Sequence, residues 1–185
     1  MSRLFQYGGI AASIVLIAFG GGALFIGLDG RAEVRDNLKR EHIVGTPDMA
    51  GVADQKIDSG SEAKQFAAGM RKHTLEATGG LTYAQMGRFL DKAGKPTNDE
   101  HAAAVQNGKP VENPARQIWV TETALSTALN TAYFAENVAT FAIVMGVALL
   151  LVGGGFLVLT LRVLRQAQPE SGKRARPTAT AIASS

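Results

Sequence analysis

The chain has 185 residues, enough for one or at most two small domains, with 19 basic and 16 acidic residues and a net charge of +3. It has no cysteine, which excludes disulfides, cysteine nucleophiles, and zinc or iron–sulfur sites with thiolate ligands. Two stretches, residues 8–28 and 137–161, carry no charge, which excludes a soluble single-domain globule.

The first uncharged stretch, residues 8–28, predicts a transmembrane helix. Its α-helix would be about 32 Å long, and the hydrocarbon core of a bilayer is about 30 Å thick. A cleavable signal peptide is the alternative, because Gly21 and Ala23 are small residues at a spacing that a signal peptidase accepts. Cleavage there would leave the apolar residues 24–28 exposed, which favours the uncleaved anchor.

The helix is expected to continue past the membrane, because residues 31–42 contain no glycine or proline. Gly45 and Pro47 then end it. Residues 46–60 are rich in Gly, Asp, Pro and Ser and predict a loop.

A second helix is predicted to start at Ser61 as its N-cap and to stop at Gly79-Gly80. Its apolar face consists of Ala63, Phe66, Ala67, Met70 and Ala77.

A third helix is predicted from Thr82, which with Gln85 matches the capping-box pattern, to Gly94. Between Gly94 and Pro114 we expect two short turns around one or two helical turns, at residues 99–106.

The last predicted helix begins at the N-cap and N1 pair Asn113-Pro114 and runs without a helix breaker to about Arg165. At 1.5 Å per residue it would be about 75 Å long, so its first half stands outside the membrane. Ala124, Ala128 and Ala132 form a small-residue stripe, on which we expect residues 31–42 to pack in antiparallel orientation. The predicted core consists of Phe66, Met70, Leu75, Leu81, Tyr83, Met86, Phe89, Leu90, Ile118, Trp119, Leu125 and Leu129.

The orientation of the chain in the membrane is predicted by the positive-inside rule, because lysine and arginine near the membrane stay on the cytoplasmic side. Outside residues 29–137 there are six basic residues and one acid, whereas residues 29–137 hold 13 basic and 15 acidic residues. Both termini are therefore predicted to be cytoplasmic in a plasma-membrane protein, although the basic residues within 31–40 act in the opposite direction.

The predicted fold class is all-α: two transmembrane helices form a hairpin that extends beyond the membrane as an antiparallel stalk, capped by a small helical extracytoplasmic domain. The predicted divisions are a cytoplasmic N-terminus (1–7), a first span (8–28), an extracytoplasmic domain and stalk (29–137), a second span (138–161) and a cytoplasmic disordered basic tail (162–185).

Small residues four apart in the spans favour close packing of the helices, although glycine is common in membrane helices generally. These pairs are Gly8/Ala12, Ala18/Gly22, Ala23/Gly27 and Ala142/Gly146. Neither span contains an ionisable residue, which counts against a channel or a transporter.

The three histidines, His42, His73 and His101, lie about 30 residues apart and form no pair at metal-binding spacing. A composite site of His73, Glu76 and His101 is the alternative. We assign no catalytic residue, metal ligand or cofactor, and we expect no nucleic-acid partner.

The start of the long helix is the candidate recognition site, because a lone tryptophan beside charged residues can anchor a partner. The alternative is that Trp119 belongs to the protein's own core. The predicted partner-binding residues are Arg116, Trp119, Glu122, Ala124, Ala128 and Ala132.

The chain resembles a family of uncharacterised actinobacterial membrane proteins with two spans. The resemblance lies in residues 29–31, 44–49, 75–80 and 115–125, and it extends over nearly all residues except the tail. Members of that family often carry the label of aromatic ring-opening dioxygenase, which implies an iron site that the histidine spacing here does not support. The resemblance thus implies a topology and no functional residues.

Two hypotheses about function follow. The first is a non-enzymatic integral membrane protein, an accessory, assembly or scaffold subunit that binds another membrane protein, an envelope component or further copies of itself. The alternative is a membrane-anchored enzyme or sensor with a metal or small-molecule site in residues 29–137.

Overall fold

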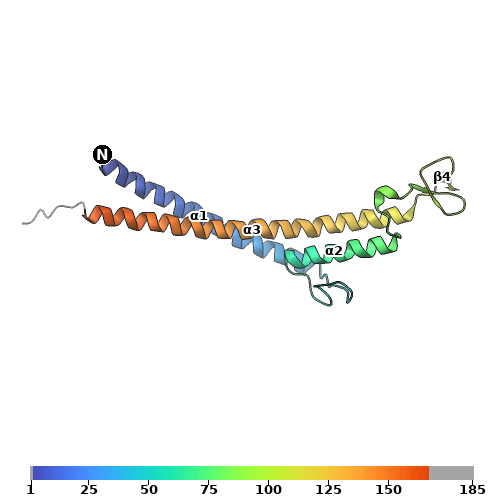
Figure 1. Ribbon diagram of the computed structural model, residues 1–185, viewed down its shortest axis with the longest axis horizontal. Helices are drawn as coiled ribbons and strands as arrows, with labels where there is room; N and C mark the ends of the chain where they lie inside the picture. Colours follow the sequence, from blue (N-terminus) through green and yellow to red (C-terminus); the bar gives the residue numbers. More distant parts are fainter. Residues whose placement is uncertain (1, 167–185) are drawn as a thin grey trace, which may run out of the picture. The chain divides into compact units, whose positions relative to one another are not determined.

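The computed structural model describes residues 2–166, and most of these lie in three helices (Figure 1). The helices are α1 (Ser2–Arg40), α2 (Gly60–Ala77) and α3 (Pro114–Gln166). Helices α1 and α3 are both long and apolar enough to cross a membrane. The prediction of a mostly helical chain with two such helices is confirmed. The predicted tail from residue 167 onward lies outside the described residues.

The chain divides into two units, each described by itself. The first contains residues 2–22 and 145–166, and the second contains residues 23–144.

In the first unit, α1 and α3 meet through small residues. Ser13 and Gly20 of α1 and Gly146 and Gly153 of α3 are buried. A Cβ atom on Gly20 would lie 2.8 Å from the carbonyl oxygen of Gly146, so a side chain at this position would push the backbones apart. Close approach of this kind is how helices associate in lipid.

The second unit continues the same pattern at Gly27, where a Cβ atom would lie 2.7 Å from the carbonyl oxygen of Ala139. The buried small residues therefore recur every seven residues, at 13, 20 and 27 in α1 and at 139, 146 and 153 in α3. A seven-residue repeat is typical of left-handed helix packing. Of the predicted four-residue pairs, Gly27 and Gly146 lie in this contact, whereas Gly8 and Gly22 have nothing within 4 Å of a Cβ position.

Helix α2 begins two residues earlier than predicted, with Ser59 instead of Ser61 as the N-cap. The Ser59 hydroxyl accepts a hydrogen bond from the Glu62 amide at 3.3 Å, and the Glu62 carboxylate accepts one from the Ser59 amide at 3.0 Å. This reciprocal capping box was hidden in the sequence because Ser59 and Ser61 are both good N-caps. The predicted end is confirmed: α2 stops at Ala77, followed by Gly79 and Gly80 with positive φ.

The loop between α1 and α2 supplies much of the core of the second unit. Met49, Val52 and Ile57 are buried, although the sequence analysis left all three out of the predicted core. They pack with Leu38, Ala63, Ala67 and Leu129. Several predicted core residues are instead half-exposed; these are Leu81, Tyr83, Ile118 and Leu125.

The predicted third helix is wrong. A single 3₁₀ turn, η1 (Tyr83–Gln85), is followed by strand β1 (Phe89–Leu90), which pairs antiparallel with β2 (Pro96–Thr97). The Asp91 carboxylate accepts hydrogen bonds from the amides of Ala93 and Lys95, both at 2.8 Å, and this side-chain-capped turn competes with a helix. Gly87 lets β2 approach the backbone closely, because a Cβ atom at this position would lie 2.5 Å from the Thr97 nitrogen.

The predicted helical turns at residues 99–106 are also wrong. Strand β3 (Val105–Gln106) pairs antiparallel with β4 (Lys109–Pro110). The two residues between them, Asn107 and Gly108, both have positive φ, as a two-residue hairpin turn requires.

The predicted start of the long helix is confirmed. The Asn113 carboxamide accepts a hydrogen bond from the Ala115 amide at 3.1 Å and donates one to the carbonyl of Gly87 at 3.0 Å. Asn113 thus caps α3 and ties its start to the segment before β1.

Candidate partner-binding surface

Trp119 is packed inside the second unit, with 3% of its surface exposed. Its indole Nε1 donates hydrogen bonds to the carbonyl of Leu81 at 2.9 Å and to the Thr78 hydroxyl at 3.3 Å. The guanidinium of Arg71 lies 5.2 Å from the centroid of the ring. These contacts correspond to the alternative interpretation, in which Trp119 holds the start of α3 against the end of α2.

Arg116 and Glu122 also make contacts within the unit. The Arg116 guanidinium stacks 3.9 Å from the centroid of the Tyr83 ring and donates to the carbonyl of Met86 at 3.1 Å. Glu122 is 5% exposed and accepts a hydrogen bond from the Ser126 hydroxyl at 2.8 Å. The charged residues that flank Trp119 therefore have partners inside the protein.

The predicted alanines are placed differently. Ala124 and Ala128 are exposed and Ala132 is half-buried. Two large neighbours on the same helix face, Ile118 and Leu125, are 42% and 49% exposed. The exposed residues of this face, here called the distal face, are Gln117, Ile118, Thr121, Ala124, Leu125 and Ala128.

Part of the distal face, residues 118–124, lies beyond the end of α1. Arg31 of α1 forms an ion pair with Glu136 at 3.3 Å, and Leu38 packs in the same cluster as Leu129. Because these pairs run in opposite directions along the two helices, Arg40, the last residue of α1, lies level with about residue 127 of α3. Ile118, Thr121 and Ala124 lie well before that level, whereas Leu125 and Ala128 line a hollow together with residues at the end of α1.

A groove of about 530 Å³ lies where the end of α1 faces α3, with α2 contributing to its wall. It is here called the α1–α3 groove. Its apolar lining consists of Val34, Leu38, Ile43, Phe66, Met70, Leu125, Ala128, Leu129, Ala132 and Ala135. Three polar residues, Asn37, Glu41 and Thr131, complete the lining.

Two basic residues that follow the first apolar stretch, Arg31 and Arg35, form ion pairs and do not line the α1–α3 groove. Besides the Arg31–Glu136 pair, Arg35 forms an ion pair with Asp58 at 3.4 Å. The Glu136 carboxylate also accepts a hydrogen bond from the Gly60 amide at 2.5 Å, at the start of α2. Arg31, Arg35, Asp58 and Glu136 line a second hollow, which shares Val34 with the α1–α3 groove.

The composite site of the enzyme hypothesis is not assembled. His73 pairs with Asp48 at 2.5 Å, and Glu76 pairs with Lys72 at 3.8 Å. His101 lies between β2 and β3, where its amide donates to Asp99. Among the described residues, no group of three His, Asp or Glu side chains is close enough to hold a metal ion.

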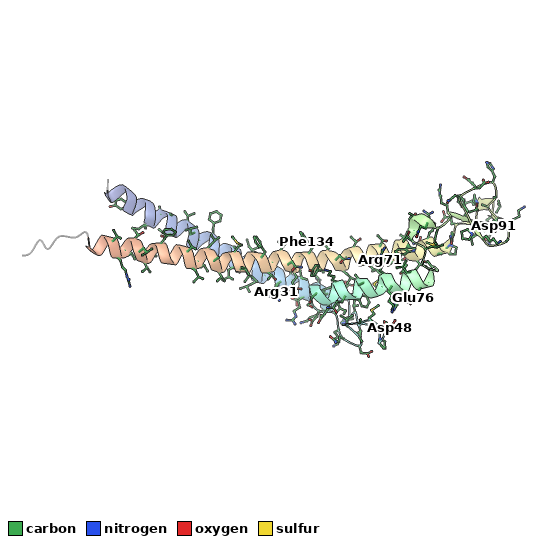
Figure 2. The ribbon with its side chains drawn as sticks, in the orientation of Figure 1. Arg31, Asp48, Arg71, Glu76, Asp91 and Phe134 are labelled. Atoms are coloured by element: carbon green, nitrogen blue, oxygen red, sulfur yellow. The ribbon has the colours of Figure 1, made fainter. Side chains whose placement is uncertain are left out.

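The Asp48 carboxylate has a pKa below its ordinary value of 3.8. The Thr46 hydroxyl donates to it at 2.6 Å and His73 contacts its other oxygen. The hydrogen bond from Thr46, followed by the one from His73, lowers the pKa of Asp48 to about 2. Because Asp48 lies in the α1–α2 loop and His73 on α2, the pair fastens the loop to that helix; Figure 2 labels Asp48 below α2.

Comparison with known proteins found no match among protein-family models, curated proteins or solved structures.

Proposed function

We propose that the chain is an integral membrane protein of two spans, with both termini cytoplasmic and residues 29–137 on the other side of the plasma membrane. In this proposal α1 and α3 form a hairpin whose antiparallel stalk carries the remaining elements. Support comes from the two long apolar helices and from the excess of basic residues outside residues 29–137. The resemblance to actinobacterial two-span proteins stays a prediction.

Within this topology the protein acts as a non-enzymatic accessory, assembly or scaffold subunit that binds another membrane or envelope protein, or a second copy of itself. The observation that carries this proposal is the distal face. Its two large aliphatic side chains, Ile118 and Leu125, are 42% and 49% exposed on α3. Contiguous apolar surface of this kind is typical of protein–protein contacts.

The test is affinity purification in mild detergent at native expression level, with co-purifying proteins identified by mass spectrometry. Ala124→Arg places a charge at the centre of the distal face, and Asn130→Arg places the same side chain on another exposed face of α3. We expect a stoichiometric partner, or a homo-oligomer, that Ala124→Arg removes and Asn130→Arg retains.

Two outcomes contradict the proposal. Equal partner recovery from both variants would show that the distal face is not the contact. A monomer that carries a bound metal or small molecule would favour the enzyme or sensor alternative instead.

A further inference from the structure

Another cavity of the second unit, here called the basic pocket, lies between the end of α1 and the loop that follows it. Its volume is about 560 Å³, within the range of small-molecule sites, roughly 300–1,000 Å³. Among the described residues, its lining consists of three basic residues, four apolar residues and one acid. These are Lys39, His42 and Lys56; Leu38, Ile43, Val44 and Ile57; and Asp58.

Backbone hydrogen bonds hold the two sides of the basic pocket together. The Ile57 amide donates to the carbonyl of Ile43 at 3.0 Å, and their neighbours Lys56 and Val44 pair as an antiparallel bridge. The loop thereby brings Lys56 back to the end of α1, beside the segment that begins at His42.

The basic side chains of the pocket are available to a ligand. Lys39, His42 and Lys56 are exposed, and none of them forms an ion pair with another described residue. The acid of the lining, Asp58, pairs with Arg35 at 3.4 Å. The pocket thus offers a local positive charge, although the segment between the two uncharged stretches holds 15 acidic and 13 basic residues.

His42 has a backbone conformation that side chains rarely adopt. It follows the last turn of α1, where its amide donates to the carbonyl of Lys39 at 3.2 Å, and its φ is 51°. Glycine is the usual residue at such a helix end, because a positive φ crowds a Cβ atom. Backbone strain of this kind is often kept at functional sites. The position of His42 therefore supports a role of its imidazole in binding.

The lining determines the chemistry of the ligand. Two ammonium groups and an imidazole match a group with close to two negative charges, and a phosphate monoester carries about −1.5 to −2 at pH 7. Lysine binds phosphate as a point charge. A carboxylate carries a single charge and would leave one lysine without a counter-charge. The apolar side of the pocket, which includes the buried Ile57 and the exposed Val44, fits a small apolar group on the same molecule.

We propose that the basic pocket binds a small organic phosphate monoester from the aqueous phase, with Lys39, His42 and Lys56 on the phosphate. Lys39 lies 11 residues after Leu28, the end of the first uncharged stretch, or about 16 Å along α1. Lipid headgroups extend only about 5–8 Å beyond the hydrocarbon core on each side. A soluble molecule therefore reaches the pocket more easily than a headgroup does. This choice of source rests on the proposed membrane crossing, whereas the pocket itself does not.

The experiment measures binding of phenyl phosphate to the full chain in detergent by saturation-transfer NMR, with inorganic phosphate and benzoate as comparison ligands. We expect phenyl phosphate to bind most tightly. Lys39→Gln and Lys56→Gln should each weaken its binding about tenfold, because each removes a charged hydrogen-bond donor. Lys92→Gln removes the same charge from an exposed lysine outside the pocket and should leave binding unchanged.

His42→Gly separates binding from folding. Glycine adopts a positive φ without strain, so the melting temperature should not fall, whereas phenyl phosphate should bind more weakly. A lower melting temperature with unchanged binding would overturn the assignment of His42 to the site.

The same titration in phosphatidylcholine vesicles, with and without phosphatidic acid, distinguishes the two sources of phosphate. Binding of phenyl phosphate in both vesicles supports an aqueous ligand, whereas its loss only with phosphatidic acid would overturn that source in favour of a headgroup. Equal binding by Lys92→Gln and the two pocket variants, or equal binding of phenyl phosphate, benzoate and inorganic phosphate, would overturn the site. None of these outcomes depends on the distal face, so the proposed function is tested separately.

Discussion

The two units of the protein hold their helices together by different means. In residues 2–22 and 145–166 the contacts depend on missing side chains, with Gly20 against Gly146 and Gly153 against Ile17. In residues 23–144 Gly27 against Ala139 is a contact of the same kind, but the core is built from side chains, including Val52 and Ile57, which belong to the loop between α1 and α2. This difference fits the proposed surroundings. Helices in lipid associate by close approach of their backbones, whereas a core in water forms by burying apolar area.

The largest expected effect comes from Gly20→Leu, which places a side chain where the Gly146 carbonyl lies. The pairing of α1 and α3 in this unit can be read out by a disulfide between Gly9→Cys and Thr160→Cys. A Cβ atom on Gly9 would lie 3.7 Å from the Thr160 Cβ, close to the spacing of about 3.8 Å in disulfides. The natural chain has no cysteine, so no other intramolecular disulfide can form.

We expect Gly20→Leu to abolish this disulfide and Gly21→Leu, which has nothing within 4 Å of its Cβ position, to leave it intact. Equal disulfide yields in the two variants would contradict the seven-residue packing.

The free energy of unfolding of the second unit is expected to fall when a buried side chain is made smaller. Ile57→Ala removes a fully buried side chain and should lower the free energy of unfolding by about 2–5 kcal/mol. Val105→Ala, at an exposed position of β3, should change it by less than about 0.5 kcal/mol. Thermal unfolding of the purified protein in detergent measures both. A small effect of Ile57→Ala would show that the α1–α2 loop is not part of the core.

A smaller effect is expected at the start of α2. Ser59→Ala removes the N-cap hydroxyl and should lower the free energy of unfolding by about 1 kcal/mol, measured in the same way. Ser61→Ala, at the residue that the sequence analysis took for the cap, should be nearly neutral. A larger loss of stability in Ser61→Ala than in Ser59→Ala would instead support the predicted N-cap, Ser61.

The smallest expected effect concerns Asp48. Its pKa in the folded protein is about 2, below its ordinary value of 3.8, so the ionised carboxylate stabilises the folded loop above pH 3.8. This contribution is lost as the pH falls through about 2, and it is small because Asp48 and His73 are both partly exposed. Hydrogen exchange of residues 44–57 between pH 5 and pH 2 should show faster opening with acid. Asp48→Asn should remove the part of that acceleration that comes from this carboxylate.

The elements that could be predicted are those with local signals. Asn113-Pro114 marked the start of α3, and the glycine pair 79–80 marked the end of α2. The β1–β2 turn was missed because the capping pattern at Thr82 was extended into a helix, whereas the Asp91 side chain holds a turn there. The Asn107-Gly108 pair is a strong hairpin signal, which outweighs the helical turns predicted for residues 99–106.

The candidate surface was only partly readable from the sequence. The sequence cannot distinguish a Trp119 that binds a partner from a Trp119 that packs in the core. Its hydrogen bonds to Leu81 and Thr78 form only in the folded protein, because they depend on tertiary structure. The groove likewise needs residues from three helices. The distal face had one available signal: the predicted extension of the first helix, 31–42, is shorter than that of the last, 114–137, so part of the latter had to lack a partner.

The hairpin turn at Asn107 and Gly108 also offers a reporter of membrane sidedness. Both residues are exposed, and exposed turns tolerate insertion. An epitope inserted between them would leave every described helix intact. Antibody access to that epitope in intact cells would then reveal on which side of the membrane residues 29–137 lie.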